Sequence, residues 1–222
     1  MIKAVIFDMD GLLIDSEPLW REAGLKTRKK FGINLPPEIA HQTMGLRSDE
    51  VVKHWHHHFP WDEPSQKVVN DYFLETVVQL IKNSDIELPG VHEAIAVIEK
   101  AGLPMALASS SPLKVIRAGI EKLHIEHKLK LIYSAEQEPY GKPHPGVYIT
   151  TADKLGIPPE LCLAFEDSPN GVLSAKSAKM KCIAVPDKLM AGNKTFGIAD
   201  KILSSLLEFN LSVLQEMGYK ND

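Results

Sequence analysis

The sequence predicts an α/β protein in which a doubly wound parallel sheet carries an inserted, all-helical cap domain. Short apolar runs alternate with amphipathic helical patterns over most of the 222 residues. Such alternation is typical of a parallel sheet covered by helices on both faces. The stretch from Glu17 to Ser84 breaks this alternation and has helical patterns throughout. We therefore expect a catalytic core formed by residues 1–15 and 86–222, and a cap formed by residues 16–85.

Six short runs have the length and composition of strands. The first, Ala4–Phe7, is continuously apolar with polar residues on both sides, as expected for a strand buried on both faces of a parallel sheet. The other runs are Met105–Ala108, Leu131–Tyr133, Cys162–Phe165, Cys182–Val185 and a short last strand at Lys201–Leu203. The sheet is thus predicted to begin close to residue 1 and to end close to residue 203.

Helical patterns separate these strands. The segment Pro112–Leu123 opens with a proline, which suits the first turn of a helix, and Ser168–Ala178 opens with a serine that can cap free amides. The remaining core helices are expected at Val91–Ala101, at Gly146–Leu155 and within Ala199–Met217, with a loop at Lys188–Gly197. The predicted strands of the core are therefore separated by helices that can cover the sheet, except for the loop before the last strand.

The predicted cap consists of helices alone. Apolar residues recur at helical spacing, as in Val69, Phe73 and Val77, and predict a face that packs against other helices. The four helical patterns are Pro18–Phe31, Pro37–Gln42, Ser48–Phe59 and Ser65–Lys82. Their position directly after the first strand predicts a lid inserted into the core.

The composition narrows the class of partner. Apolar residues make up 44% and charged residues 24% of the chain, as in ordinary globular proteins. A net charge of −4 gives no broad attraction for nucleic acid or for an anionic membrane. No apolar run is long enough to cross a bilayer, and the first residues do not form a signal peptide. Cys162 and Cys182 are expected as buried free thiols, in keeping with a cytoplasmic location. We expect a small-molecule ligand held by local groups, and the sequence indicates no obligate protein partner.

The strongest chemical signal is the motif Asp8-Met9-Asp10-Gly11, directly after the first predicted strand. Side chains two residues apart on an extended strand end point the same way. Both carboxylates therefore face the space beyond the carboxyl edge of the sheet, where ligands bind in open parallel sheets. Two close carboxylates repel each other, and a hard divalent cation such as Mg²⁺ relieves that repulsion with oxygen ligands. The alternative is a plain acidic turn after a strand.

Three further segments bring polar groups to the same edge. Glu166-Asp167 follows the strand Cys162–Phe165, so Asp167 is expected to complete a metal shell, with Glu166 ligating through water or holding the loop. Acids also favour the first turn of a helix, which is the alternative for this pair. In the run Ser109-Ser110-Ser111, a serine hydroxyl and the free amides at the start of the next helix can cradle a phosphate or simply cap that helix. Lys142, in a loop stiffened by prolines, can neutralise a phosphate oxygen. Together these groups predict a metal site, a nucleophile and a phosphate clamp.

These four motifs resemble those of the haloacid dehalogenase superfamily, in the subgroup with a helical cap inserted after the first motif. The resemblance covers essentially the whole chain and implies the Rossmann-like core of that family. Within it, the stretch Asp8–Trp20 and the tripeptide Gly45-Leu46-Arg47 are most similar to sugar-phosphate phosphatases of the 2-deoxyglucose-6-phosphate or hexitol phosphatase type.

The resemblance also implies a role for each residue. Asp8 would attack phosphorus to form an aspartyl-phosphate, and Asp10 would protonate the leaving oxygen and then activate water. Mg²⁺ would be held by the carboxylate of Asp8, the backbone carbonyl of Asp10 and the carboxylate of Asp167. The remaining oxygens of the phosphate would be held by Ser109, the amide of Ser110 and Lys142.

Two other functions compete with hydrolysis. A mutase similar to beta-phosphoglucomutase would have a histidine where this chain has Trp20 and a lysine where it has Pro112. Both departures favour a phosphatase. A non-enzymatic phospho-receiver domain also uses acids, a hydroxyl residue and a lysine. It would be shorter, would lack the helical insertion, and would carry its acceptor on a middle strand.

The cap residue expected to contact the substrate is Arg47. It follows Gly45, where a tight turn between two cap helices is predicted, and its guanidinium can donate several hydrogen bonds to sugar hydroxyls. The alternative is that Arg47 begins the next cap helix and pairs with Glu50.

Overall fold

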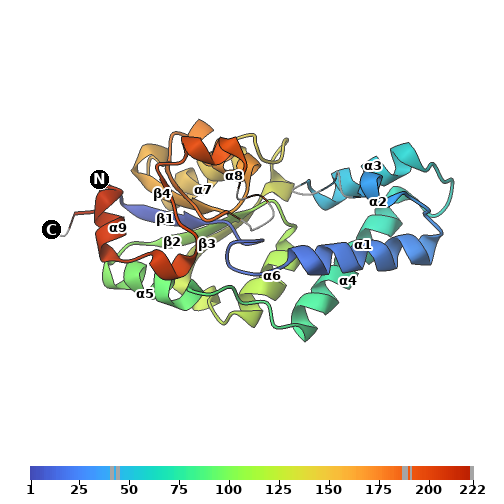
Figure 1. Ribbon diagram of the computed structural model, residues 1–222, viewed down its shortest axis with the longest axis horizontal. Coiled ribbons are helices and arrows are strands. Elements are labelled where there is room, and N and C mark those ends of the chain that lie inside the picture. Colours follow the sequence, from blue (N-terminus) through green and yellow to red (C-terminus); the bar gives the residue numbers. More distant parts are fainter. Residues whose placement is uncertain (41–42, 44–45, 187–189, 191, 221–222) are drawn as a thin grey trace.

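The computed structural model describes residues 1–40, 43, 46–186, 190 and 192–220 and contains a six-stranded, wholly parallel sheet. Its strand order is β3-β2-β1-β4-β5-β6, a doubly wound order that reverses direction beside β1 (Figure 1). The strands are β1 (Ala4–Phe7), β2 (Met105–Ser109), β3 (Leu129–Ser134), β4 (Cys162–Glu166), β5 (Lys181–Ala184) and β6 (Lys201–Ile202). The predicted α/β class is confirmed.

Alternate residues of each strand pack on opposite faces of the sheet. Val5 and Phe7 belong to one apolar cluster, while Ala4 and Ile6 belong to another. The first cluster has the larger side chains of β2 and β4, such as Leu107 and Phe165, and the second has mostly alanine and cysteine. Helices cover both faces, which explains why the strands read as continuous apolar runs rather than as alternating ones.

Core helices lie on both sides of the sheet. Residues of α5 (Val91–Lys100), α6 (Leu113–Lys122) and α9 (Leu211–Glu216) pack on the face with the larger side chains. The helices α7 (Gly146–Leu155) and α8 (Pro169–Ser177) pack on the face with the smaller ones, and Figure 1 shows them across the sheet from α5. The predicted cap of α8 by Ser168 is present, since its Oγ accepts a hydrogen bond from the amide of Gly171 at 3.1 Å.

Four helices gather at one end of the molecule, away from the sheet (Figure 1). They are α1 (Glu17–Phe31), α2 (Pro37–Ala40), α3 (Ser48–His58) and α4 (Gln66–Asn83). The predicted apolar face of α4 is buried through Val69, Phe73 and Val77, and α4 contacts both α1 and α3. Residues 41–42 of the predicted helix Pro37–Gln42, and Gly45 of the predicted turn, lie outside the described residues.

Two neighbouring crossings connect these helices to the sheet. The amide of Asp15 donates to the carbonyl of Ile86 at 2.7 Å, and the amide of Leu88 donates to the carbonyl of Leu13 at 3.1 Å. We propose that the core of residues 1–15 and 86–222 and the cap of residues 16–85 meet at this paired crossing.

Most predicted elements differ from the observed ones by one or two residues. Strand β3 begins at Leu129, two residues before the predicted start, and β6 ends one residue early. The predicted loop after β5 contains a short 3-10 helix at Lys194–Ile198 within its described part. Cys162 and Cys182 are free and buried, as expected. None of the helices in the described ranges is both long and apolar enough to span a bilayer.

Candidate active site

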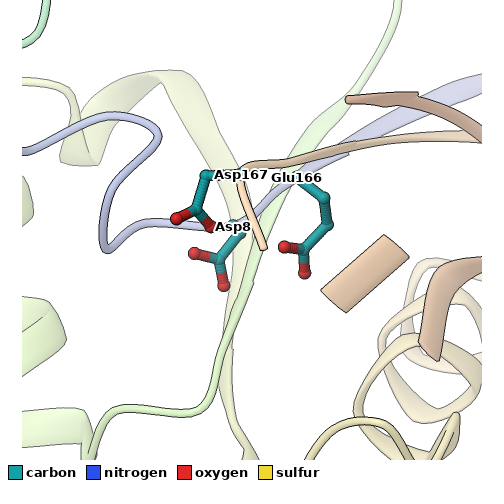
Figure 2. Close-up of side chains that lie close together, drawn as sticks. All are labelled: Asp8, Glu166 and Asp167. Carbon is teal, nitrogen blue, oxygen red and sulfur yellow. The ribbon is translucent and has the colours of Figure 1, made fainter. Parts of the chain in front are cut away.

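The predicted catalytic residues meet at the carboxyl ends of β1, β2 and β4. Asp8 follows β1, and its amide donates to the carbonyl of Phe165 on the neighbouring strand β4 at 3.0 Å. This contact places Asp8 beside Glu166, the last residue of β4, and beside Asp167 (Figure 2). Ser109 ends β2, on the other side of β1. Because β1 and β4 flank the point where the strand order reverses, the site lies where doubly wound sheets bind ligands.

Three carboxylates converge at this point. Oxygens of Asp8, Glu166 and Asp167 all lie within 4.8 Å of one another. Burial raises the pKa of Asp8 to about 7, and the charges of Glu166 and Asp10 raise it too, against the opposing charge of Lys142. Burial and the neighbouring charges of Asp8 and Glu166 also raise the pKa of Asp167 well above its usual value. The cluster therefore carries more buried negative charge than Lys142 balances.

This charge imbalance fits a divalent cation. Carboxylate oxygens are the ligands that Mg²⁺ prefers. A bound cation would offset the burial and the mutual repulsion that together raise the pKa values of Asp8 and Asp167. The carboxylate of Glu166 is less free than the other two, because its Oε1 accepts hydrogen bonds from Lys142 and Tyr148. Asp8 and Asp167 are therefore the better candidates for direct ligands.

Room for Asp167 depends on Gly11. This glycine has a positive φ of 78°, and a Cβ added to it would lie only 2.2 Å from Oδ2 of Asp167. Any other residue would be strained at this φ, and its Cβ would clash with the carboxylate of Asp167. The glycine of the Asp-x-Asp-Gly motif thus allows the sharp turn after β1 and the close approach of the third acid.

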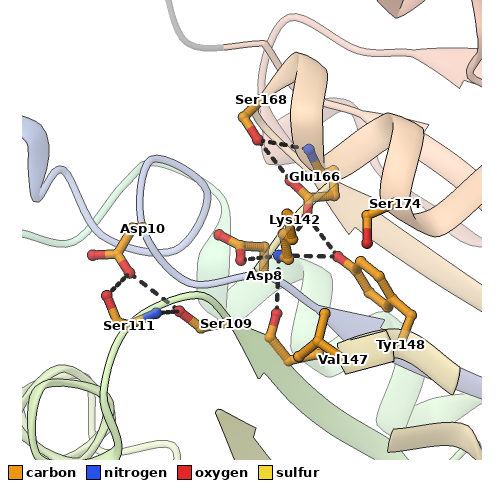
Figure 3. Close-up of polar contacts among 12 residues, drawn as sticks. Asp8, Asp10, Ser109, Ser111, Lys142, Val147, Tyr148, Glu166, Ser168 and Ser174 are labelled. Atoms are coloured by element: carbon orange, nitrogen blue, oxygen red, sulfur yellow. Dashed lines mark hydrogen bonds and ion pairs between the residues drawn. The ribbon is translucent and has the colours of Figure 1, made fainter. Parts of the chain in front are cut away.

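Lys142 lies in the middle of a buried polar network (Figure 3). Its Nζ donates to Asp8 Oδ1 at 2.5 Å, to Glu166 Oε1 at 2.6 Å and to the carbonyl of Ala108 at 3.1 Å. Burial lowers the pKa of Lys142, but the charges of Asp8 and Glu166 outweigh it and the net shift is upward. Lys142 is therefore a fixed cation directly beside the predicted nucleophile.

Asp10 belongs to a second set of contacts. Its Oδ1 accepts hydrogen bonds from Ser16 Oγ at 2.6 Å and from Trp20 Nε1 at 3.1 Å, both on the cap side. Its Oδ2 accepts from Ser109 Oγ at 3.3 Å, at the end of β2, and from Ser111 Oγ at 2.8 Å, in the loop after β2 (Figure 3). These four hydrogen bonds hold the carboxylate of Asp10 between the sheet and the cap.

Several of these partners are not predicted by the sequence. Tyr148 reads as one more apolar residue of a core helix, yet its hydroxyl donates to Glu166 at 2.6 Å and lies 3.5 Å from Lys142. Ser16 and Ser111 give no signal beyond helix capping. Trp20 was expected to mark only a departure from the mutases. Trp20 nevertheless donates a hydrogen bond to Asp10, as the histidine of a mutase would be expected to do. The absence of that histidine therefore does not discriminate against a mutase.

One cavity of about 770 Å³ joins the sheet edge to the cap. The predicted residues Asp8, Asp10, Ser109, Ser110, Lys142 and Asp167 all line it. Its volume falls within the usual range for small-molecule sites. Pro112, where a mutase would have a lysine, also lines it and adds no charge.

Arg47 does not line this cavity. Its Nη1 donates to the carbonyls of Glu138 at 3.1 Å and Ala135 at 3.4 Å, in the segment before Lys142, and its Nη2 pairs with Asp49 at 3.2 Å. The proposed pairing with Glu50 is present only through the backbone, since the amide of Arg47 donates to Glu50 Oε2 at 3.0 Å. In this arrangement Arg47 connects α3 to the core, so a contact with the substrate stays a prediction.

Comparison with known proteins agrees with this geometry. The family model described as haloacid dehalogenase-like hydrolase matches residues 5–185. The chain belongs to that family. It is 42% identical to hexitol phosphatase B of Escherichia coli K12 over 209 residues, which cover 93% of this chain and 94% of the relative. It is 31% identical to the phosphorylated carbohydrates phosphatase of Thermotoga maritima, covering 82% of this chain and 84% of that one.

Solved structures of the family share the whole fold. The crystal structure of CbbY from Rhodobacter sphaeroides in complex with phosphate matches with a TM-score of 0.89 and 27% identity, covering 97% of this chain and 100% of CbbY. Since the family model describes hydrolases and both curated relatives above are named phosphatases, the chain is a hydrolase of phosphoric monoesters. This membership decides against a phospho-receiver domain.

Proposed function

We propose that this chain is a Mg²⁺-dependent phosphatase that hydrolyses a phosphorylated sugar or sugar alcohol through an aspartyl-phosphate at Asp8. The observation that carries the proposal is the position of Asp8. It lies just after β1, in contact with Lys142 and close to the carboxylates of Glu166 and Asp167, and it lines a cavity of metabolite size. Two curated relatives, a hexitol phosphatase and a phosphorylated carbohydrates phosphatase, support a phosphorylated sugar or sugar alcohol as the substrate class. The 2-deoxyglucose-6-phosphate type rests on the resemblance of the sequence motifs.

The first step is the transfer of the phosphoryl group to Asp8. A carboxylate oxygen of Asp8 forms a bond to phosphorus while the bond from phosphorus to the sugar oxygen breaks. Asp10 donates a proton to the leaving oxygen, so that a neutral alcohol departs. Ser109, the amide of Ser110 and Lys142 would hold the phosphoryl oxygens that do not react.

The second step releases phosphate. Asp10, now ionised, accepts a proton from a water molecule as the water oxygen attacks phosphorus, and the bond to Asp8 breaks. Inorganic phosphate leaves and both aspartates return to their starting states. When bound, Mg²⁺ would supply charge that offsets the repulsion between the acids and the phosphate, held by Asp8, the backbone carbonyl of Asp10 and Asp167.

Glu166 has a supporting part in this proposal. Its carboxylate is fully buried and accepts from Lys142, Tyr148 and Ser168 (the last at 3.3 Å). It would therefore orient Lys142 toward Asp8 rather than contact the phosphate. Because Lys142 is shared between Asp8 and Glu166, movement of Glu166 is expected to change the position of the cation beside the nucleophile.

The competing reaction on this fold is the isomerisation of a sugar phosphate by a mutase, and the phosphatase names of the curated relatives favour hydrolysis over it. Of the two departures from the mutases, the missing histidine at Trp20 no longer argues against a mutase, because Trp20 also contacts Asp10. The missing lysine at Pro112 still does, because Pro112 lines the cavity without a charge. A mutase would return an isomer of its sugar phosphate, whereas the proposed enzyme releases one phosphate for each substrate consumed. Both products can be measured in the same reaction.

The experiment that tests the proposal is a screen of phosphorylated metabolites for phosphate release. We expect turnover of sugar and sugar-alcohol phosphates with Mg²⁺, none after chelation, and inhibition by Ca²⁺, whose looser geometry misplaces the nucleophile. Full activity after exhaustive chelation would contradict the metal assignment. Isomerisation without phosphate release would favour the mutase. We place the enzyme in the cytoplasm, where its two free thiols would stay reduced.

A further inference from the structure

The cavity extends along helix α1 well beyond the catalytic groups. Trp20, Gly24 and Arg28 are spaced four residues apart on α1, so they share one side of the helix, and all three line the cavity. With a rise of 1.5 Å per residue, Arg28 lies about 12 Å further along α1 than Trp20. Because Trp20 contacts Asp10, this strip of α1 leads from the predicted acid–base residue to the far end of the cavity.

Arg28 is a cation without a counterion in the described part of the chain. Its Nη1 makes only a long hydrogen bond of 3.4 Å to the carbonyl of Leu35, and its Nε is buried without any hydrogen-bond partner. By contrast, Arg21 and Lys26 on the same helix pair with Glu17 and Glu22. Burial lowers the pKa of Arg28, and no acidic side chain offsets this shift. A half-buried guanidinium with free donors beside a cavity favours a ligand that supplies acceptors.

Apolar side chains share the cavity with Arg28. The guanidinium carbon lies 5.8 Å from the centre of the Trp55 ring, a distance typical of a cation–π contact. The cavity is also lined by the cap residues Leu35, Val51 and Phe73. Apolar walls of this kind can accept the carbon chain of a ligand, while a few polar groups fix its orientation. Arg28 is such a group, since its donors are largely unused.

We propose that Arg28 determines specificity by binding an oxygen acceptor at the end of the substrate remote from the phosphate. The inference rests on the proposed function and deepens it. With its phosphate at Asp8, a six-carbon sugar or sugar-alcohol phosphate extends along α1 toward the guanidinium. Helical side chains lean toward the N-terminal end of their helix, which brings the guanidinium of Arg28 somewhat closer to Asp8. A three-carbon phosphate is nevertheless too short to reach the guanidinium. Arg28 thus selects longer chains with a terminal hydroxyl or carboxylate oxygen.

The test compares substrates of different length on Arg28→Met. Methionine has a similar length and stays apolar, so it removes the donors while filling the space. We measure kcat/KM for a hexitol 6-phosphate and for glycerol phosphate with Mg²⁺. The ratio of the two values is expected to fall about 10- to 100-fold, as the loss of a charge-assisted hydrogen bond predicts, mainly through KM. Arg28→Lys, which keeps the charge but not the fork, should restore part of the ratio.

The matched control is Lys29→Met. Lys29 neighbours Arg28 on α1, is exposed and does not line the cavity, so its substitution should leave the ratio unchanged. An unchanged ratio in Arg28→Met would overturn the inference. So would an equal loss on both substrates together with a lower Tm, because Arg28 would then only hold the segment at Leu35. If the wild-type enzyme turns over an aryl phosphate but no sugar phosphate, the proposed substrate class is wrong, and the proposed role of Arg28 is then wrong as well.

Discussion

A methyl group added at Gly171 should lower both stability and activity by displacing Glu166, which holds Lys142 beside Asp8. Gly171 lies in the first turn of α8, and a Cβ added there would lie 1.8 Å from Glu166 Oε2 and 2.1 Å from Oε1. The carboxylate of Glu166 cannot move aside freely, because it is fully buried and bonded to Lys142 and Tyr148. In Gly171→Ala either α8 shifts or Glu166 releases Lys142.

The magnitude follows from opposing effects. Overpacking of a buried position costs about 1–3 kcal/mol, and disturbing a buried, charged hydrogen-bond network adds to that cost. Alanine is the better helix former by up to about 1 kcal/mol, which offsets part of the loss. We expect a net destabilisation of about 2 kcal/mol, or roughly 4–8 °C in Tm for a chain of this size. Displacement of Lys142 should lower kcat by about 100-fold, as expected for a lost phosphate contact.

The assay is a double-mutant cycle with Glu166→Ala. Truncation of Glu166 removes the atoms that the new methyl group would meet, so Gly171→Ala should cost little in that background. Thermal unfolding and kcat are measured for both single variants and for the double variant. Gly24→Ala, where the new Cβ would make an ordinary contact of 3.5 Å with Trp55, is the stability control. A Gly171→Ala protein as stable and active as the wild type would refute the reasoning, and so would equal costs in both backgrounds.

Three further predictions concern Tyr148, Arg47 and the two buried cysteines. Tyr148→Phe should lower kcat about 10-fold, because Glu166 loses the hydroxyl donor at 2.6 Å that helps it to orient Lys142. A kcat equal to that of the wild type would contradict this role of Tyr148. Arg47→Ala should lower kcat/KM for aryl and sugar phosphates alike, because its guanidinium holds the segment before Lys142; a loss confined to the sugar phosphate would instead support the substrate contact that the sequence predicts. The thiols of Cys162 and Cys182 should react with a thiol reagent only after unfolding, since burial raises the pKa of Cys162 to about 12 and that of Cys182 further still; rapid labelling of the native protein would contradict their placement.

The fold could be predicted because its strands are buried on both faces. Runs such as Ala4–Phe7 and Cys162–Phe165 carry no polar residue, and in a parallel sheet both faces of a strand are covered. Strand ends are harder to predict, because pairing with a neighbour extends a strand past its apolar run. The start of β3 illustrates this, since Leu129 pairs with Met105 of β2 although the polar Lys130 follows it.

The sequence predicts those residues of the site that lie at the ends of strands. Asp8, Asp10 and Asp167 follow strands and Ser109 ends one, and a parallel sheet brings such residues to one edge. Tyr148 and Gly171 could not be found in this way, because their importance comes from side-chain contacts with Glu166 across two packed elements. The unpaired state of Arg28 is likewise a property of the packed cap and leaves no mark in the sequence.

The measurement that tests the central claim most directly is the detection of phosphate on Asp8. In Asp10→Asn the residue that would activate water is lost, so the aspartyl-phosphate should accumulate after addition of a substrate with a good leaving group. Mass spectrometry of the acid-quenched protein should then show one added phosphoryl group, on the peptide that contains Asp8, and none in Asp8→Asn. A phosphoryl group on another residue, or phosphate release by Asp8→Asn at more than a few per cent of the wild-type rate, would contradict Asp8 as the nucleophile.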